Sequence, residues 1–124
     1  MDISGQSIVF QTNNEEKIGD IEWSEHPKFK GVHMKNIITG ASTEGMISCH
    51  LVRVMPGCCL EMHIHDKNLE IHEVMDGKGI CLLDGKEILY QKGVSAIIPK
   101  GSPHMVKAGD KGLMIMARFT PALV

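Results

Sequence analysis

The stretch from Gly57 to Gly77 reads GCCLEMHIHDKNLEIHEVMDG and decides how the rest of the chain is interpreted. Its histidines His63 and His65 are one residue apart. On an extended strand such side chains point to one face and lie about 6.6 Å apart, so both imidazoles can reach one metal ion. Residues 66–68 are rich in turn formers, which predicts a reversal that returns Glu70 on a neighbouring strand beside the histidines. The stretch therefore predicts three ligands of a metal site.

A second stretch, Gly93 to His104, supplies a fourth candidate ligand. It contains a strand-like run, a Pro/Gly turn and then His104, which opens another apolar run. Three imidazoles and one carboxylate suit several first-row metals, namely Fe, Mn, Co, Ni, Cu or Zn. The expected cofactor is one divalent transition metal ion, whose identity the ligand set leaves open.

The spacing of these residues resembles the two sequence motifs of the cupin superfamily. The first motif matches at Gly57, His63, His65, Glu70 and Gly77, and the second at Gly93, Pro99, Gly101 and His104. The asparagine that usually ends the second motif is replaced by Ala108. The resemblance implies a small single-domain cupin in which the metal ligands are His63, His65, Glu70 and His104.

Short apolar runs separated by Gly, Pro and Asp turns continue along the chain, and no long helix is predicted. The expected strands are 7–10, 31–39, 46–55, 79–83, 86–91, 93–98, 104–108 and 113–120, with a polar loop over 11–17 and a last turn over 108–112. This pattern is typical of an all-β sandwich or barrel. The resemblance makes it a jelly-roll barrel, also described as a double-stranded β-helix.

The length of 124 residues suits one hydrophobic core. We expect an N-terminal arm and edge strands over residues 1–45 and a cupin barrel over residues 46–124, within one domain. The first residues have neither the basic start of a secretion signal nor a long apolar run, so a cytoplasmic protein without a membrane span is expected. The net charge is −2 and no basic run occurs, which argues against nucleic acid as a partner.

The chain contains four cysteines, Cys49, Cys58, Cys59 and Cys81. In a reducing compartment they are expected to be free thiols. The adjacent pair Cys58 and Cys59 leaves a redox role open, although small apolar filler is the simpler interpretation.

Some predicted strands, such as Leu113 to Ala117, are apolar on both faces, so each face needs a cover. The cupin resemblance implies a homodimer that pairs through the N-terminal strands. The alternative is that the N-terminal arm of the same chain covers that face.

His72 is the candidate catalytic residue, because it shares the strand parity of Glu70 and should face the barrel interior near the metal. It would transfer a proton, orient Glu70 from outside the ligand shell, or only hydrogen bond within the pocket wall. Other polar and aromatic residues are not assigned to the site: His26, His33 and His50 as structural or surface histidines, Glu61 as exposed, and Tyr90 as packing.

An ion that takes six ligands and receives four from the protein keeps two positions open. Because a divalent ion with one carboxylate keeps a positive charge, a small anionic molecule is the expected ligand. The resulting hypothesis is a metalloenzyme of the dioxygenase, isomerase, decarboxylase or lyase type. The alternative is a non-catalytic, metal-dependent binding or sensor protein.

Overall fold

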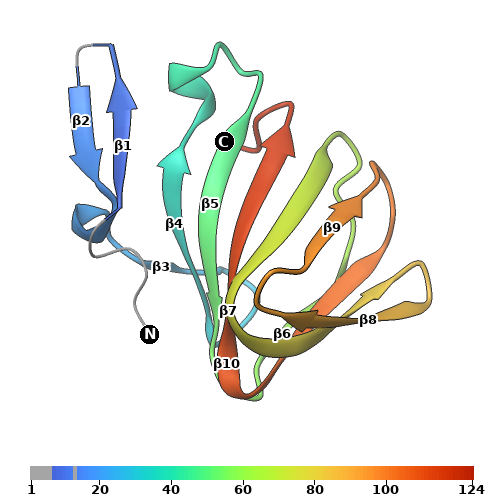
Figure 1. Cartoon of the computed structure of the whole chain (residues 1–124). Coiled ribbons are helices and arrows are strands. Elements are labelled where there is room, and N and C mark those ends of the chain that lie inside the picture. Colours follow the sequence, from blue (N-terminus) through green and yellow to red (C-terminus); the bar gives the residue numbers. More distant parts are fainter. Residues whose placement is uncertain (1–6, 13) are drawn as a thin grey trace.

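The computed structural model describes residues 7–12 and 14–124, which fold almost entirely into β-strands (Figure 1). The strands are β1 (Ile8–Gln11), β2 (Asn14–Lys17), β3 (Ser24–Glu25), β4 (Val32–Ile38), β5 (Ser48–Val54), β6 (Cys59–His63), β7 (Leu69–Leu83), β8 (Lys86–Gln91), β9 (Ser95–Ile98) and β10 (His104–Thr120). Two 3-10 turns, η1 (Ile18–Asp20) and η2 (Gly40–Ser42), complete the described elements. The predicted all-β class is confirmed.

The two longest strands, β7 and β10, belong to both layers of the barrel. The first half of β7 pairs with β9 and with the second half of β10, which also pairs with β5. The second half of β7 pairs with β8 and with the first half of β10, which also pairs with β6. One layer therefore has the order β3-β4-β5-β10-β7-β9 and the other has the order β6-β10-β7-β8. These antiparallel layers form the predicted jelly roll.

Glycines at the corner between the layers allow β7 and β10 to bend together. The pairing register of the two strands shifts between Ala108 and Leu113. Gly77 and Gly112 meet there with φ angles of 83° and 80°, and a Cβ on Gly77 would collide with the carbonyl oxygen of Gly112. The predicted turn over residues 108–112 is wrong, because these glycines let one strand bend through a bulge where a reversal was expected.

The N-terminal segment packs on the outer face of the larger layer. β1 and β2 form an antiparallel hairpin, so the predicted loop over residues 11–17 is wrong at Gln11 and over 14–17, which are strand residues. Ile18 and Trp23 pack against an apolar cluster that includes Leu51, and the cationic groups of Lys35 and Arg53 lie 4.8 and 4.2 Å from the centroid of the Trp23 ring. The arm thus covers part of that apolar face within one chain. Residues 1–6 and 13 of the predicted arm lie outside the described residues.

The space between the layers holds the main hydrophobic core, which includes Val32, Val54, Cys81, Tyr90, Val106 and Ile115. The four cysteines form no disulfide in the structure. Within the described part of the chain, no helix has the length and apolar character needed to cross a membrane.

Candidate metal centre

Three of the four predicted ligands come together inside the barrel. Each of His63, His65 and His104 offers a ring nitrogen, and these nitrogens lie within 4.8 Å of one another. His63 ends β6 and pairs directly with His104 on β10, which brings both side chains to one face. His65 lies two residues beyond the end of β6. The ring centroids of His63 and His65 are nevertheless only 5.0 Å apart.

Glu70 reaches the histidines from the start of β7. The turn predicted between His65 and Glu70 is present. However, β7 pairs with β9 and β10 and not with β6, so the prediction that Glu70 lies on the strand next to the histidines is wrong. The carboxylate approaches because the jelly roll folds β7 over the site. Its Oε1 lies 3.2 Å from Nε2 of His104 and 3.9 Å from Nε2 of His65.

Backbone carbonyls determine which ring nitrogen faces the centre. Nδ1 of His63 lies 2.7 Å from the Glu61 carbonyl oxygen, and Nδ1 of His104 lies 3.0 Å from that of Ser102. A carbonyl only accepts, so each Nδ1 carries the proton and each Nε2 of a neutral ring has a free lone pair. This is the tautomer in which a histidine binds a metal through Nε2.

Two buried atoms at the centre lack hydrogen-bond partners among the described residues. They are Nε2 of His104 and Oε1 of Glu70, which face each other. When the His104 ring is neutral and its proton is on Nδ1, the contact places two lone pairs together, which is unfavourable away from water. A cation between them would satisfy both atoms. The residues therefore fit a divalent metal ion.

The protonation states of His63, His65 and Glu70 also suit metal binding. Burial lowers the pKa of His63 to about 4 and lowers the pKa of His65 as well, so both rings are neutral at pH 7. Burial alone raises the pKa of Glu70, but the contacts with His104 and His72 outweigh it and hold that pKa well below its usual value. Burial lowers the pKa of His104, yet Glu70 and the Ser102 carbonyl outweigh it and raise that pKa.

His72 is buried behind Glu70 and is hydrogen bonded at both ring nitrogens. Its Nε2 lies 2.7 Å from Oε2 of Glu70, and its Nδ1 lies 2.8 Å from the hydroxyl of Tyr90. Because the carboxylate only accepts, Nε2 carries the proton, and Nδ1 of the neutral ring accepts from Tyr90. Burial raises the pKa of Tyr90, which keeps its hydroxyl protonated. Tyr90 was expected only to pack, and this contact is one that the sequence prediction missed.

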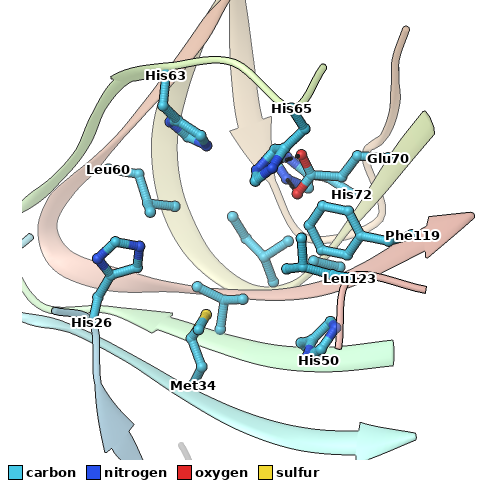
Figure 2. Close-up of a pocket in the computed structure, with 13 residues that line it drawn as sticks. His26, Met34, His50, Leu60, His63, His65, Glu70, His72, Phe119 and Leu123 are labelled. Carbon is cyan, nitrogen blue, oxygen red and sulfur yellow. Dashed lines mark hydrogen bonds and ion pairs between the residues drawn. The ribbon is translucent and has the colours of Figure 1, made fainter. Parts of the chain in front are cut away.

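A cavity of about 80 Å³ opens beside these residues (Figure 2). One side is formed by His63, His65, Glu70 and His72. The rest is mostly apolar and includes Met34, Val52, Leu60, Ile115, Ala117, Phe119 and Leu123. Pockets for drug-sized molecules begin at roughly 300 Å³, so this cavity suits a ligand of few non-hydrogen atoms.

Two histidines that the sequence did not assign to the site, His26 and His50, also line the cavity. His50 is hydrogen bonded at both nitrogens, to Asn36 and Ser48. His26 stacks on Phe29 with ring centroids 4.5 Å apart. Both residues precede the two motifs, and only the fold brings them to the cavity, so no local pattern identified them.

Comparison with known protein families assigns the chain to a family. The profile of the Cupin domain family matches residues 50–117, which is more than half of the chain. The protein therefore belongs to the cupin domain family. A search of curated protein sequences finds no significant match.

Solved structures share the fold at low sequence identity. A predicted oxalate decarboxylase from Thermotoga maritima has a TM-score of 0.77 and 18% identity, covering 83% of this chain and 95% of that chain. KdgF from Halomonas sp. has a TM-score of 0.73 and 18% identity, covering 83% and 88%. An RmlC-like cupin from Shewanella frigidimarina has a TM-score of 0.74 and 16% identity, covering 85% and 87%. These similarities establish the cupin fold.

Proposed function

We propose that the protein is a metalloenzyme that acts on a small anionic substrate. One divalent transition metal ion would be held by Nε2 of His63, His65 and His104 and by a carboxylate oxygen of Glu70. The observation that carries the proposal is the pair of buried acceptor atoms on His104 and Glu70 that have no hydrogen-bond partner among the described residues, with Glu70 also lining a small cavity. When bound, the ion would supply a Lewis acid that polarises an anionic substrate oxygen, or oxygen chemistry if the metal is redox-active.

The protein's own residues would prepare this site in two ways. The hydrogen bonds from Tyr90 to His72 and from His72 to Oε2 of Glu70 fix the carboxylate, so that its other oxygen is directed to the histidines. The apolar side chains of the cavity exclude water from a bound substrate, which strengthens electrostatic interactions there.

The substrate class is proposed from charge and size. The proposed centre has a net positive charge, because one carboxylate does not neutralise a divalent ion. The cavity has room for few non-hydrogen atoms. Oxalate decarboxylases occur among the proteins of similar fold, which supports a small carboxylate as the substrate.

A specific observation also favours the alternative function, a metal-dependent binding or sensor protein. His72 has both nitrogens engaged, so it is better placed to orient Glu70 than to exchange a proton with a substrate. A non-catalytic protein would need no free acid or base beside the metal.

The enzyme hypothesis is tested by screening metal-loaded protein against small carboxylates, including oxalate, with oxygen consumption and product formation as readouts. We expect turnover in wild type, none in His63→Ala, and at least tenfold slower turnover with retained metal in His72→Gln. Ligand binding that is equal in wild type and His72→Gln, without turnover in either, would favour the binding protein.

We also propose that residues 1–45 and 46–124 belong to one domain. A further proposal is that the chain forms a homodimer through its N-terminal strands. The exposed Ile8 and Phe10 of β1 support such pairing, with 41% and 68% of their surface accessible. Sedimentation analysis of wild type and Phe10→Asp tests the dimer, which we expect the charge to weaken. The cytoplasmic location stays a prediction.

A further inference from the structure

His26 is a polar residue of the cavity wall that the proposed metal centre does not use. It lies between β3 and β4, far from the metal motifs in sequence. Figure 2 shows its ring beside Leu60 and Met34, on a different side of the cavity from Glu70 and Phe119. A ligand that binds at the proposed centre and extends into the cavity can therefore meet His26 with its other end.

Local hydrogen bonds fix the tautomer of His26. Its Nδ1 accepts from the backbone N–H groups of Lys28, at 3.0 Å, and Phe29, at 3.3 Å. An accepting Nδ1 carries no proton, so the neutral ring is protonated at Nε2. Burial and the nearby Lys28 lower the pKa of His26, which favours the neutral ring. Stacking on Phe29, with an interplanar angle of 17°, holds the ring in place.

The other polar side chains of the cavity wall are already engaged. Both nitrogens of His50 are hydrogen bonded, and so are both nitrogens of His72. The remaining polar groups, His63, His65 and Glu70, belong to the proposed metal centre. Among the described residues, no group forms a hydrogen bond with Nε2 of His26. This N–H, on a half-buried ring of the cavity wall, is therefore available to donate to a ligand.

We infer that His26 is a specificity-determining residue, whose Nε2–H donates to a second polar group of the substrate, so that the preferred substrate is a small acid with an oxygen acceptor at both ends. A dicarboxylate is the simplest member of this class. The inference rests on the proposed function, in which the first acid group binds at the metal. A second oxygen placed against the apolar part of the wall would lose water without replacement, and His26 provides the replacement.

The test uses cobalt(II)-loaded protein and three pairs of acids of equal length: acetate with oxalate, propanoate with malonate, and butanoate with succinate. Each pair exchanges a terminal methyl group for a carboxylate. The visible absorption of cobalt reports binding without turnover, and the quantity compared is the ratio of Kd for the monoacid to Kd for the diacid. In wild type we expect a ratio of about ten or more for at least one pair.

Two variants of His26 distinguish the role of Nε2 as a donor to the ligand from the role of Nδ1 as an acceptor in the turn. His26→Asn keeps a side-chain acceptor for the turn but has no group at the position of Nε2. His26→Gln carries an amide N–H that reaches about as far as Nε2 but gives up the turn acceptor. His33→Asn is the control, because His33 is absent from the cavity wall. We expect the ratio to fall about fivefold or more in His26→Asn and to stay within about twofold in the other two variants.

The outcomes distinguish the inference from the proposed function. An unchanged ratio in His26→Asn would overturn the inference, as would the lack of any diacid preference in wild type. If the ratio falls in both His26→Asn and His26→Gln and the Tm of both variants is lowered, His26 acts only through the turn. That result would also overturn the inference. Failure of wild-type protein to bind cobalt would instead overturn the metal centre itself.

Discussion

His104 and His50 are two histidines of neighbouring strands that are buried to the same degree, with 0% and 1% of their surface exposed. Their hydrogen bonding differs. Nδ1 of His50 bonds to Asn36 and its Nε2 to Ser48, whose hydroxyl also accepts from the Leu123 backbone N–H. His104 is bonded only through Nδ1, and among the described residues its Nε2 has no hydrogen-bond partner. Burial alone therefore does not identify a ligand, whereas a buried lone pair that faces a carboxylate does.

Replacement of His104 should have the largest effect on metal binding. We expect added metal at about 100 times its Kd to raise the Tm of wild type by roughly 10 °C, because binding stabilises only the folded state. In His104→Ala the added metal should change Tm by less than about 2 °C, since a ligand is missing. The measurement is thermal unfolding with and without metal. A full metal-induced increase in His104→Ala would exclude His104 as a ligand.

Replacement of His50 should lower the stability of the protein and leave its metal affinity nearly unchanged. His50→Ala removes the hydrogen bonds of the imidazole to Ser48 and Asn36, leaves the Ser48 hydroxyl with only the Leu123 N–H, and should lower the free energy of unfolding by about 2 kcal/mol. Metal affinity should remain within about twofold of wild type, because His50 lies outside the proposed ligand set. Denaturant unfolding and metal titration measure the two quantities. A large loss of metal affinity without loss of stability would reverse the assigned roles of the two histidines.

Acid should destabilise the metal-free protein. The pKa of His63 is lowered to about 4, and those of His65 and His50 are lowered too, so the folded state binds fewer protons than the unfolded state below the usual histidine value. The free energy of unfolding should therefore decrease as pH falls from about 6.5 toward 4. The lowered pKa of Glu70 adds a loss below about 4.5, while the raised pKa of His104 offsets part of the decrease.

We expect the Tm of metal-free protein to be roughly 5 °C lower at pH 5 than at pH 7. Bound metal should be released below about pH 6, because protons compete for the imidazoles. Scanning calorimetry and metal analysis across this range provide the check. A Tm that rises on acidification, or metal occupancy that persists to about pH 4, would contradict the ligand set.

Removal of the Tyr90 hydroxyl should have the smallest effect. Tyr90→Phe keeps the ring in the core but leaves Nδ1 of His72 without its donor, so the Glu70 carboxylate is less firmly oriented. Metal affinity should fall about three- to tenfold, less than for a ligand. Isothermal titration with the metal measures this change, and Trp23→Phe serves as a control, because Trp23 packs with the outer apolar cluster and does not line the cavity. An unchanged affinity would show that His72 needs no support from Tyr90.

Local spacing predicted the cupin fold and the candidate ligands, because both motifs place glycines, histidines and a carboxylate at fixed intervals. Strand parity also placed His72 in the interior. The sequence did not reveal the contact of Tyr90 with His72 or the position of His26 in the cavity wall, since both depend on how distant strands cross. It likewise did not show that β10 bends at Gly112 without ending, because a glycine-rich segment fits a turn and a bulge equally well.

We infer that the facing acceptor atoms of a neutral His104 ring and Glu70 mark a metal site. Inductively coupled plasma mass spectrometry of untagged wild type, His104→Ala and His50→Ala, each purified without added metal, measures the metal content. We expect close to one divalent transition metal ion per chain in wild type and His50→Ala, and less than about one tenth of that in His104→Ala. Absence of metal from wild type, or equal metal in all three proteins, would contradict this inference.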